Sequence, residues 1–296
     1  MNELKSCTLC PRKCGVNRYK ETGVCGANDK IKVAYYHLHM WEEPIISGDK
    51  GSGTIFFSYC NLKCIFCQNY KISTKGYGRE ITEERLQELC LELQEKGAHN
   101  INLVTPTHYV LQIVSSIHKI KGNELKIPIV YNTSSYENVS TIQMLRGIVD
   151  IYLADLKYFD DTLACNYSHC KDYFHYASLA IEEMVRQVGS FVICDGLMKR
   201  GVIVRILILP GHVEDTKKLV HYLYTTYHDK IIISLMNQYT PLKKFAKYPN
   251  LNRKISDDEY QEVIDYALHL GITYAFIQEG NTQSESFIPN FDCSNI

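Results

Sequence analysis

Seven short apolar runs between residues 54 and 278 constrain the fold more than any other feature of the chain. Each run is rich in Val, Ile, Leu or Tyr and is bounded by turn-forming residues, as buried parallel strands are. The runs are Thr54–Ser58, Asn100–Thr105, Ile127–Asn132, Val149–Ala154, Val202–Leu209, Lys230–Met236 and Thr273–Gln278. The sequence therefore predicts an α/β protein with six or seven parallel strands.

Helical patterns separate these runs. Apolar residues recur at i, i+3, i+4 and i+7 in Leu86–Leu93 and again in Val110–Ile117. A capping box at Ser256–Glu259 predicts a helix that ends at Leu270. Alternating strands and helices imply right-handed crossovers between parallel strands. Six or seven such units favour a full or partial barrel, with a doubly wound open sheet as the alternative.

Three cysteines directly follow the first strand run. Cys60, Cys64 and Cys67 have the spacing C-x3-C-x2-C. A cubane iron–sulfur cluster normally takes four Cys ligands, so three ligands leave one iron free. An open coordination position is typical of a reactive metal rather than a structural one. We interpret this loop as the ligand set of a catalytic cluster.

A second group of cysteines lies near the N-terminus. Cys7, Cys10, Cys14 and Cys25 have the spacing C-x2-C-x3-C-x10-C, and four thiolates fill either a zinc shell or a four-Cys cluster. We predict a closed, structural metal site, because the segment has few apolar residues with which to order itself. The chain is thereby divided into a Cys-rich N-terminal extension, residues 1–50, and a parallel-sheet domain, residues 51–296.

Polar side chains gather where the predicted strands end. In a barrel, catalytic groups lie at the carboxyl ends of the strands, and these ends can be read from the sequence. They carry, in chain order, Thr105, His108, Asn132, Ser134, Asp155, Lys157 and Arg205. We predict that these residues meet at one rim of the sheet, beside the three-cysteine loop.

Composition argues against several kinds of partner. The formal net charge of −1 gives no electrostatic basis for binding nucleic acid or an anionic membrane. No run of about 18 apolar residues is present, so no membrane-spanning helix is expected, and no signal-peptide pattern opens the chain. Twelve cysteines, several at metal-binding spacings, favour a reducing compartment. We therefore predict a cytoplasmic protein.

The three-cysteine spacing, with the aromatic Phe66 before the last cysteine, resembles the radical S-adenosylmethionine (radical SAM) superfamily. With the N-terminal cysteines added, the chain is similar to the PflX-like subgroup, which is related to pyruvate formate-lyase activating enzymes. The segments that carry this likeness are Cys10–Arg18, Glu42–Pro44, Gly51–Ser58, Cys60–Asn69, Asn100–His108, Tyr131–Ser134, Asp150–Tyr158, Leu209–Gly211, Gln238–Tyr239 and Ile288–Phe291.

The resemblance implies a partial (β/α)6 barrel of the TIM type and two cofactors. One is a [4Fe–4S] cluster on the three-cysteine loop, and the other is S-adenosylmethionine (SAM). Their reaction would give methionine and a 5′-deoxyadenosyl radical that abstracts hydrogen from a substrate. The resemblance also implies a low-potential electron donor of the flavodoxin or ferredoxin type, and it makes a protein substrate one of the options. For the N-terminal cysteines, zinc and an auxiliary iron–sulfur cluster both stay open.

Under this resemblance the strand-end residues take roles at SAM. Arg205 is expected to pair with the SAM carboxylate or a substrate anion. Asn132 and Ser134 have donors and acceptors for ribose hydroxyls, and the backbone of Phe66 is expected to contact adenine. Asp155 and Lys157, which point to one face of an extended segment, are expected to pair with each other or to contact ribose and substrate.

One further candidate residue belongs to the predicted site, and two places depart from the family pattern. His108 is a candidate for proton handling. Thr105-Pro106-Thr107 stands where the superfamily has a Gly-Gly-Glu segment that holds the SAM amino group, and Ser135 stands where the subgroup usually has Gly.

Three functions are compatible with the sequence. The first is a radical SAM enzyme of undefined substrate, and the second is an activase that makes a glycyl radical in a partner enzyme. The third is a non-catalytic iron–sulfur electron carrier, which would be expected to have four ligands for each cluster and no SAM pocket.

Overall fold

A ten-stranded sheet forms the centre of the molecule. The computed structural model describes residues 3–278, 291, 293 and 296, so of the segment Ile288–Phe291 only Phe291 is described. Seven strands run parallel in the order β10-β9-β8-β6-β5-β4-β2. They are β2 (Ser52–Phe57), β4 (Ile101–Val104), β5 (Ile129–Thr133), β6 (Ile151–Asp155), β8 (Leu197–Leu207), β9 (Ile232–Met236) and β10 (Ala275–Ile277). The predicted α/β class and parallel sheet are confirmed.

Three antiparallel strands extend the sheet. β1 (Ile31–His39) pairs with β2 and with β3 (Arg79–Ile81), and β7 (Val192–Cys194) pairs with β8. The sequence analysis did not predict β1, because the register shifts between Val33 and Tyr35 and such a bulge interrupts the two-residue alternation of a strand. The boundary proposed at residue 50 stays a prediction, and β1 lies N-terminal to it within the main sheet.

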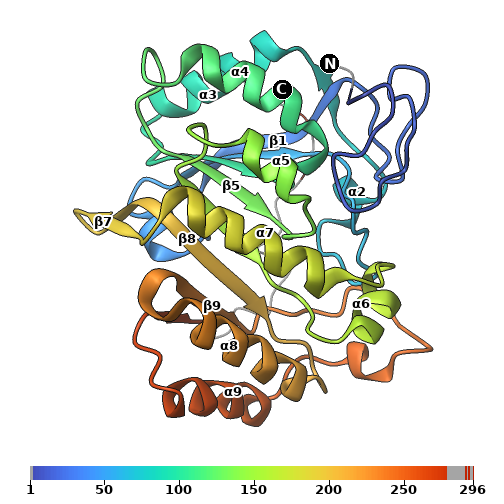
Figure 1. Cartoon of the computed structure of the whole chain (residues 1–296), viewed down its shortest axis with the longest axis vertical. Helices are drawn as coiled ribbons and strands as arrows, with labels where there is room; N and C mark the ends of the chain where they lie inside the picture. Colours follow the sequence, from blue (N-terminus) through green and yellow to red (C-terminus); the bar gives the residue numbers. More distant parts are fainter. Residues whose placement is uncertain (1–2, 279–290, 292, 294–295) are drawn as a thin grey trace.

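Helices cover one face of the sheet in chain order (Figure 1). They are α3 (Glu83–Glu95), α4 (Val110–Ile120), α5 (Val139–Met144), α7 (Tyr173–Val188), α8 (Val213–Tyr227) and α9 (Asp257–His269). The capping box predicted for the last helix is present, with Ser256 and Glu259 bonded reciprocally. Shorter helices are α1 (Pro44–Ser47), α2 (Tyr70–Ser73) and α6 (Asp161–Ser168). Within the described ranges, no helix has the length and apolar character needed to cross a membrane.

The two faces of the strands bury different partners. Residues such as Tyr131 and Val204 pack in the large core that includes the helix residues. The opposite face carries apolar residues near the amino ends of the strands, and Ile46 of α1 packs against them. These inward residues are Val130, Ile151, Leu153, Ile203 and Ile232. Helix α1 therefore closes the amino end of the inner face and leaves the carboxyl end open.

Candidate active site

A cavity of about 1120 Å³ occupies the open, carboxyl end of the inner face. Four neighbouring strands each contribute a polar side chain to its wall: Asn132, Asp155, Arg205 and Ser234. Each lies two residues after one of the apolar strand residues that pack with Ile46 of α1. Residues two apart in a strand point to the same face of the sheet. The same strand face thus changes from apolar core to polar cavity wall along its length.

The three-cysteine loop forms another wall of this cavity. Cys60, Cys64 and Cys67 all line it, and each sulfur accepts a hydrogen bond. Ser168 Oγ donates to Cys64 Sγ at 2.9 Å, Ser73 Oγ donates to Cys67 Sγ at 3.2 Å, and the Leu62 amide donates to Cys60 Sγ at 3.4 Å. Hydrogen bonds to sulfur are one of the means by which proteins tune iron–sulfur clusters.

The chemistry of these three thiols fits a metal cluster. Burial raises the pKa of Cys60 to about 12 and also raises the pKa of Cys67, with Cys64 as a further unfavourable charge for both. Three adjacent thiolates therefore need cations to stabilise them, which bound iron would supply. Among the described residues, no three His, Cys, Asp or Glu side chains are already grouped at coordination distances, so the thiols would have to turn toward one another.

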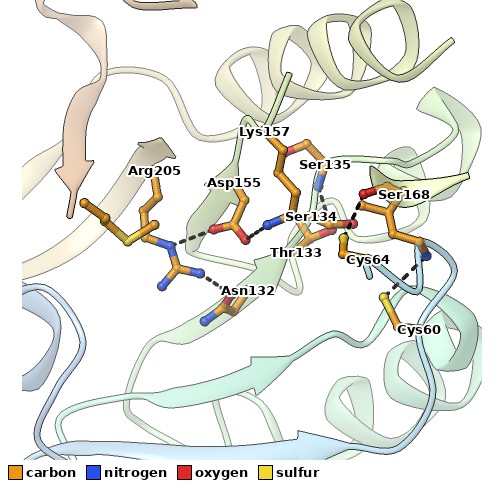
Figure 2. A network of polar contacts seen from close by, with 12 residues as sticks. Cys60, Cys64, Asn132, Thr133, Ser134, Ser135, Asp155, Lys157, Ser168 and Arg205 are labelled. Carbon is orange, nitrogen blue, oxygen red and sulfur yellow. Dashed lines mark hydrogen bonds and ion pairs between the residues drawn. The ribbon is translucent and has the colours of Figure 1, made fainter. Parts of the chain in front are cut away.

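A ladder of charged side chains leads away from the cysteines (Figure 2). Lys157 Nζ is 2.7 Å from Asp155 Oδ2, and Asp155 Oδ1 is 2.8 Å from Arg205 Nε. Arg205 Nη1 is 2.9 Å from Glu42 Oε2, and its Nη2 donates to Asn132 Oδ1 at 2.7 Å. The predicted pairing of Asp155 with Lys157 is therefore one step of a longer chain of contacts.

Burial and pairing have opposite effects on the carboxylates of the ladder. Burial disfavours the ionised form of Asp155, but the adjacent Arg205 and Lys157 outweigh it, so its pKa lies below the ordinary value. At Glu42 burial prevails, and its pKa is raised although Arg205 opposes the shift. The ionised form is therefore stabilised at Asp155 and disfavoured at Glu42.

The structure brings most of the predicted site residues together. Phe66, Thr105, Asn132, Ser134, Asp155, Lys157 and Arg205 line the same cavity as the three cysteines. Thr105 and Ser135 both have positive φ, at +57° and +61°. These left-handed conformations favour glycine, so Thr105 and Ser135 both adopt a backbone conformation that is strained for their residue types.

His108 does not line the cavity, which corrects its placement at the active rim. A short 3-10 turn, Thr107–Tyr109, follows β4 and carries the His108 side chain into the core, where it is 2% exposed. Its Nε2 is 2.8 Å from the Ser58 carbonyl oxygen, and burial lowers its pKa to about 3. His108 is therefore a buried neutral side chain, and the geometry gives it no route to a substrate proton.

Two cavity residues were not assigned a role from the sequence. Glu42 and Glu43 lie in the connection between β1 and β2 and line the cavity, with Glu42 bonded to Arg205, Asn102 and Asn132. Strand-end analysis does not find them, because this connection lies at the amino ends of the strands. The one sequence signal was the family-like triplet Glu42–Pro44.

The four N-terminal cysteines lie outside the cavity but close to one another. Burial raises the pKa of Cys25, and the charges of Cys7 and Cys14 also raise it. Burial likewise raises the pKa of Cys10, and the charges of Cys25 and Cys7 add to that shift. A Cβ atom placed on Gly23 would lie 3.3 Å from Cys25 Sγ and 3.5 Å from Cys14 Sγ. The glycine therefore lets the backbone lie close to two of the sulfurs, and four neighbouring thiols are a donor set that zinc or an iron–sulfur cluster uses.

The fold and the site together define an α/β protein with a cysteine-lined cavity at the carboxyl edge of a parallel sheet. The model of the radical SAM superfamily matches residues 54–223, a span that exceeds half of the 296 residues. The chain belongs to the radical SAM superfamily. Membership implies an enzyme with a [4Fe–4S] cluster and SAM as cofactors.

Individual proteins resemble the chain in sequence or in fold. The uncharacterized protein MJ0674 of Methanocaldococcus jannaschii is 30% identical over 277 residues, which cover 90% of this chain and 75% of that protein. Streptococcus suis SuiB bound to precursor peptide SuiA has a TM-score of 0.51 at 16% identity, covering 75% of this chain and 46% of SuiB. HydG, a maturase of the [FeFe]-hydrogenase, has a TM-score of 0.50 at 15% identity, covering 77% and 52%.

These two structural likenesses concern the fold alone. The chain spans about half the length of the two solved proteins.

Proposed function

We propose that this chain is a radical SAM enzyme that binds SAM and a substrate side by side in the cavity, and abstracts a hydrogen atom from that substrate. One observation carries the proposal: the three-cysteine loop and the polar ends of four strands line a single cavity of about 1120 Å³. Pockets for single small ligands span roughly 300–1,000 Å³, so this cavity has room for a cofactor and part of a substrate.

Cys60, Cys64 and Cys67 would hold the cluster, with Ser73 and Ser168 donating to two of the sulfurs. When bound, the reduced cluster supplies the electron that cleaves SAM to methionine and a 5′-deoxyadenosyl radical. The protein's own part is to keep three thiolates at one wall and to limit water beside them. Because its proton is donated to Cys64, Ser168 Oγ accepts a 2.7 Å hydrogen bond from the Tyr158 hydroxyl, which fixes the serine hydroxyl near Cys64.

The ladder residues would hold SAM. Of the ladder residues, Lys157 lies nearest the cysteines (Figure 2), and the charge of Cys64 acts on its ammonium group. Together with Asp155 it is placed to contact the ribose or the methionine end of SAM. Asn132 and Ser134 offer further polar atoms on the neighbouring strand. Arg205 keeps its role as an anion partner, although Asp155, Glu42 and Asn132 already bind three of its N–H groups.

The adenine and amino-group contacts are assigned to two cavity residues. The backbone of Phe66, whose ring meets Tyr167 and Tyr239 edge-on, would contact adenine. Thr105, which replaces the glycine-rich segment of related proteins, would offer its carbonyl or hydroxyl to the SAM amino group. Its left-handed backbone turns this segment at the end of β4.

The finer family assignment also belongs to the proposal. We infer a partial (β/α)6 barrel, PflX-like kinship and a cytoplasmic, oxygen-sensitive protein that receives electrons from a flavodoxin-like or ferredoxin-like donor. The N-terminal cysteines would hold a structural zinc or an auxiliary cluster, and the closeness of the four thiols supports a bound metal there.

A narrower version of the proposal is that the chain is an activase for a glycyl-radical enzyme. A loop of that partner enzyme would then enter the cavity of this chain. The chain has no Arg-Val-Ser-Gly-Tyr-like segment of its own, so the radical would be made in the partner. A glycyl-radical enzyme encoded beside this one would support that version, and its absence from the host would exclude it. The large cavity beside the three-cysteine loop argues against a non-catalytic electron carrier.

The proposal is tested by product formation. The protein is reconstituted anaerobically with iron and sulfide, reduced with dithionite and mixed with SAM, and 5′-deoxyadenosine and methionine are measured by mass spectrometry. We expect product from the wild type and from Cys194→Ala, an exposed cysteine outside the cavity, and none from Cys64→Ala. Absence of product from the fully loaded, reduced wild type would contradict the proposed function.

A further inference from the structure

The closed end of the cavity is built by a segment that the parallel strands do not supply. Residues 40–51 connect β1 to β2, and within them α1 (Pro44–Ser47) presses Ile46 into the inner face of the sheet. Ile46 is fully buried against Val130, Leu153 and Ile203. The two residues before α1, Glu42 and Glu43, line the cavity directly above this apolar contact. We call Glu42 and Glu43 the floor carboxylates.

The floor carboxylates and Asp155 outnumber the cations at this end of the cavity. The charges of Glu42, Glu43 and Asp155 all act on Arg205, and Lys157 pairs with Asp155. Three carboxyl groups therefore face two cations, and burial raises the pKa of both Glu42 and Glu43, so a further cation is needed to stabilise both of them in the ionised form. His39, which also lines the cavity, is held neutral because burial lowers its pKa to about 4, and the charge of Arg205 adds to that shift. The missing positive charge is not supplied by the described side chains around Arg205.

One buried acceptor atom on a residue that lines the cavity, Glu43 Oε2, has no hydrogen-bond donor among the described residues. Glu43 is 8% exposed although it lines the cavity, and Asn102 donates its amide to Glu42 Oε1 at 2.9 Å. A buried acceptor without a donor is costly, so the floor is suited to a ligand that brings an N–H donor.

We propose that Glu42 and Glu43 form a subsite for a protonated primary amine on the substrate. An ammonium group carries one positive charge and three donors, which matches the surplus carboxyl group and the unpaired acceptor of Glu43. The inference rests on the proposed function, because it names a chemical class for the substrate of that site. SAM also carries an ammonium group and is the main competing occupant.

The position of the floor separates the amine from the reacting end. In Figure 2, Arg205 lies on one side of the drawn network and Cys60 lies on the other. Glu42 contacts the guanidinium of Arg205, so the floor is on the side away from Cys60. A substrate anchored by its amine at the floor would extend its carbon chain toward the cysteines. The side chains of Leu207 and Met236, which line the cavity, give such a chain an apolar path.

The test uses n-hexylamine as the cationic probe and 1-hexanol as its neutral counterpart. Binding to the full-length reconstituted protein is followed anaerobically through the fluorescence of Trp41, the only tryptophan, which lines the cavity. We expect the wild type to bind hexylamine at least tenfold more tightly than hexanol, with saturating SAM present or absent. Equal affinities for the two probes, or competition between hexylamine and SAM, would overturn the proposal.

Variants locate the charge that is responsible. Glu43→Gln should remove the preference for the amine. Glu88→Gln should keep it, because Glu88 is exposed, pairs with Arg85 and does not line the cavity. An unchanged preference in Glu43→Gln would overturn the proposal, and the wild-type comparison of the two probes stands even if that variant does not fold. Neither titration requires SAM cleavage, so failure of the wild type to form 5′-deoxyadenosine would count against the proposed function alone.

Discussion

The two cysteine groups of this chain differ in what surrounds their sulfur atoms. Cys60, Cys64 and Cys67 line a large cavity that they share with charged side chains from the sheet. The N-terminal cysteines lie in a lobe closed by its own backbone, in which the Cys7 amide donates to Val16 O at 2.9 Å and the Gly15 amide donates to Cys7 O at 3.0 Å. Open surroundings suit a reactive metal, and closed surroundings suit a structural one.

One arginine joins the two groups. Arg12 lies between Cys10 and Cys14, and its guanidinium donates to the carbonyl oxygens of Asn61 at 2.8 Å and Ser168 at 2.9 Å, and also to that of His169. The N-terminal lobe therefore supports the backbone of the three-cysteine loop without entering the cavity. The comparison predicts that damage to the lobe acts first on stability, whereas damage to the loop acts first on chemistry.

The largest expected effect on stability comes from Cys25→Ala. If the lobe binds metal as a closed structural site, loss of one ligand should lower the free energy of unfolding by about 4 kcal/mol, part of the roughly 10–16 kcal/mol with which such sites bind zinc. Anaerobic denaturant titration measures this, with Cys194→Ala as the matched control. A loss no larger than that of the control would remove the distinction between the two groups. Cys64→Ala should cost less stability than Cys25→Ala.

A buried carboxyl between the two groups should give a pH-dependent effect. Burial raises the pKa of Glu137 from 4.5 to about 7, although Thr107, Thr133 and Tyr131 donate to it. The folded state thus keeps a proton that the unfolded chain loses, so wild-type stability falls as pH rises from 4.5 to 7, by about 3 kcal/mol.

The variant Glu137→Gln should lack this dependence. Its stability relative to the wild type should therefore rise by about 3 kcal/mol between pH 4.5 and pH 8, whatever the variant costs at low pH. Denaturant titrations of both proteins across this range give the difference directly. Parallel pH profiles for the two proteins would show that Glu137 ionises normally.

Arg12→Lys should have an intermediate effect and tests the link itself. Lysine keeps the charge but cannot reach several carbonyl groups at once, so we expect a loss of about 2 kcal/mol in stability. The loop should also become less well held, which would broaden the electron paramagnetic resonance (EPR) spectrum of the reduced cluster. An unchanged spectrum together with unchanged stability would mean that the lobe and the loop are independent.

The smallest expected effect comes from relieving strain at the cavity rim. Thr105 is β-branched and has a φ of +57°, a conformation that costs non-glycine residues roughly 1–2 kcal/mol. Thr105→Gly should therefore raise stability by up to about 1 kcal/mol after the entropic cost of glycine. Thermal denaturation beside the wild type measures the change, and a clear loss of stability would show that the Thr105 side chain contributes more than its strain costs.

Burial made most of the sheet predictable. β2, β4, β5 and β9 are buried along their whole length, so they are continuous apolar runs in the sequence. The observed bounds lie close to the predicted ones, except that β8 begins at Leu197 rather than Val202. β1 escaped because its bulge breaks the alternation of the strand. Local patterns alone do not encode this kind of irregularity, which depends on the pairing partner.

The site was predictable only where strand direction determines position. Asn132, Asp155 and Arg205 share the cavity because the carboxyl ends of parallel strands meet at one edge. His108 was misplaced because a single turn of 3-10 helix decides whether it faces the cavity or the core. Glu42 was not given a role because it enters from the opposite end of the strands, and its contact with Arg205 is a tertiary one.

The most direct test of the central claim is the EPR spectrum of the dithionite-reduced, reconstituted protein before and after SAM is added. If the three-cysteine loop leaves one iron open to a cavity that binds SAM, the spectrum of the wild type should shift on addition of SAM, and Cys64→Ala should show no such shift. A wild-type spectrum that SAM leaves unchanged, or a shift that persists in Cys64→Ala, would contradict the account.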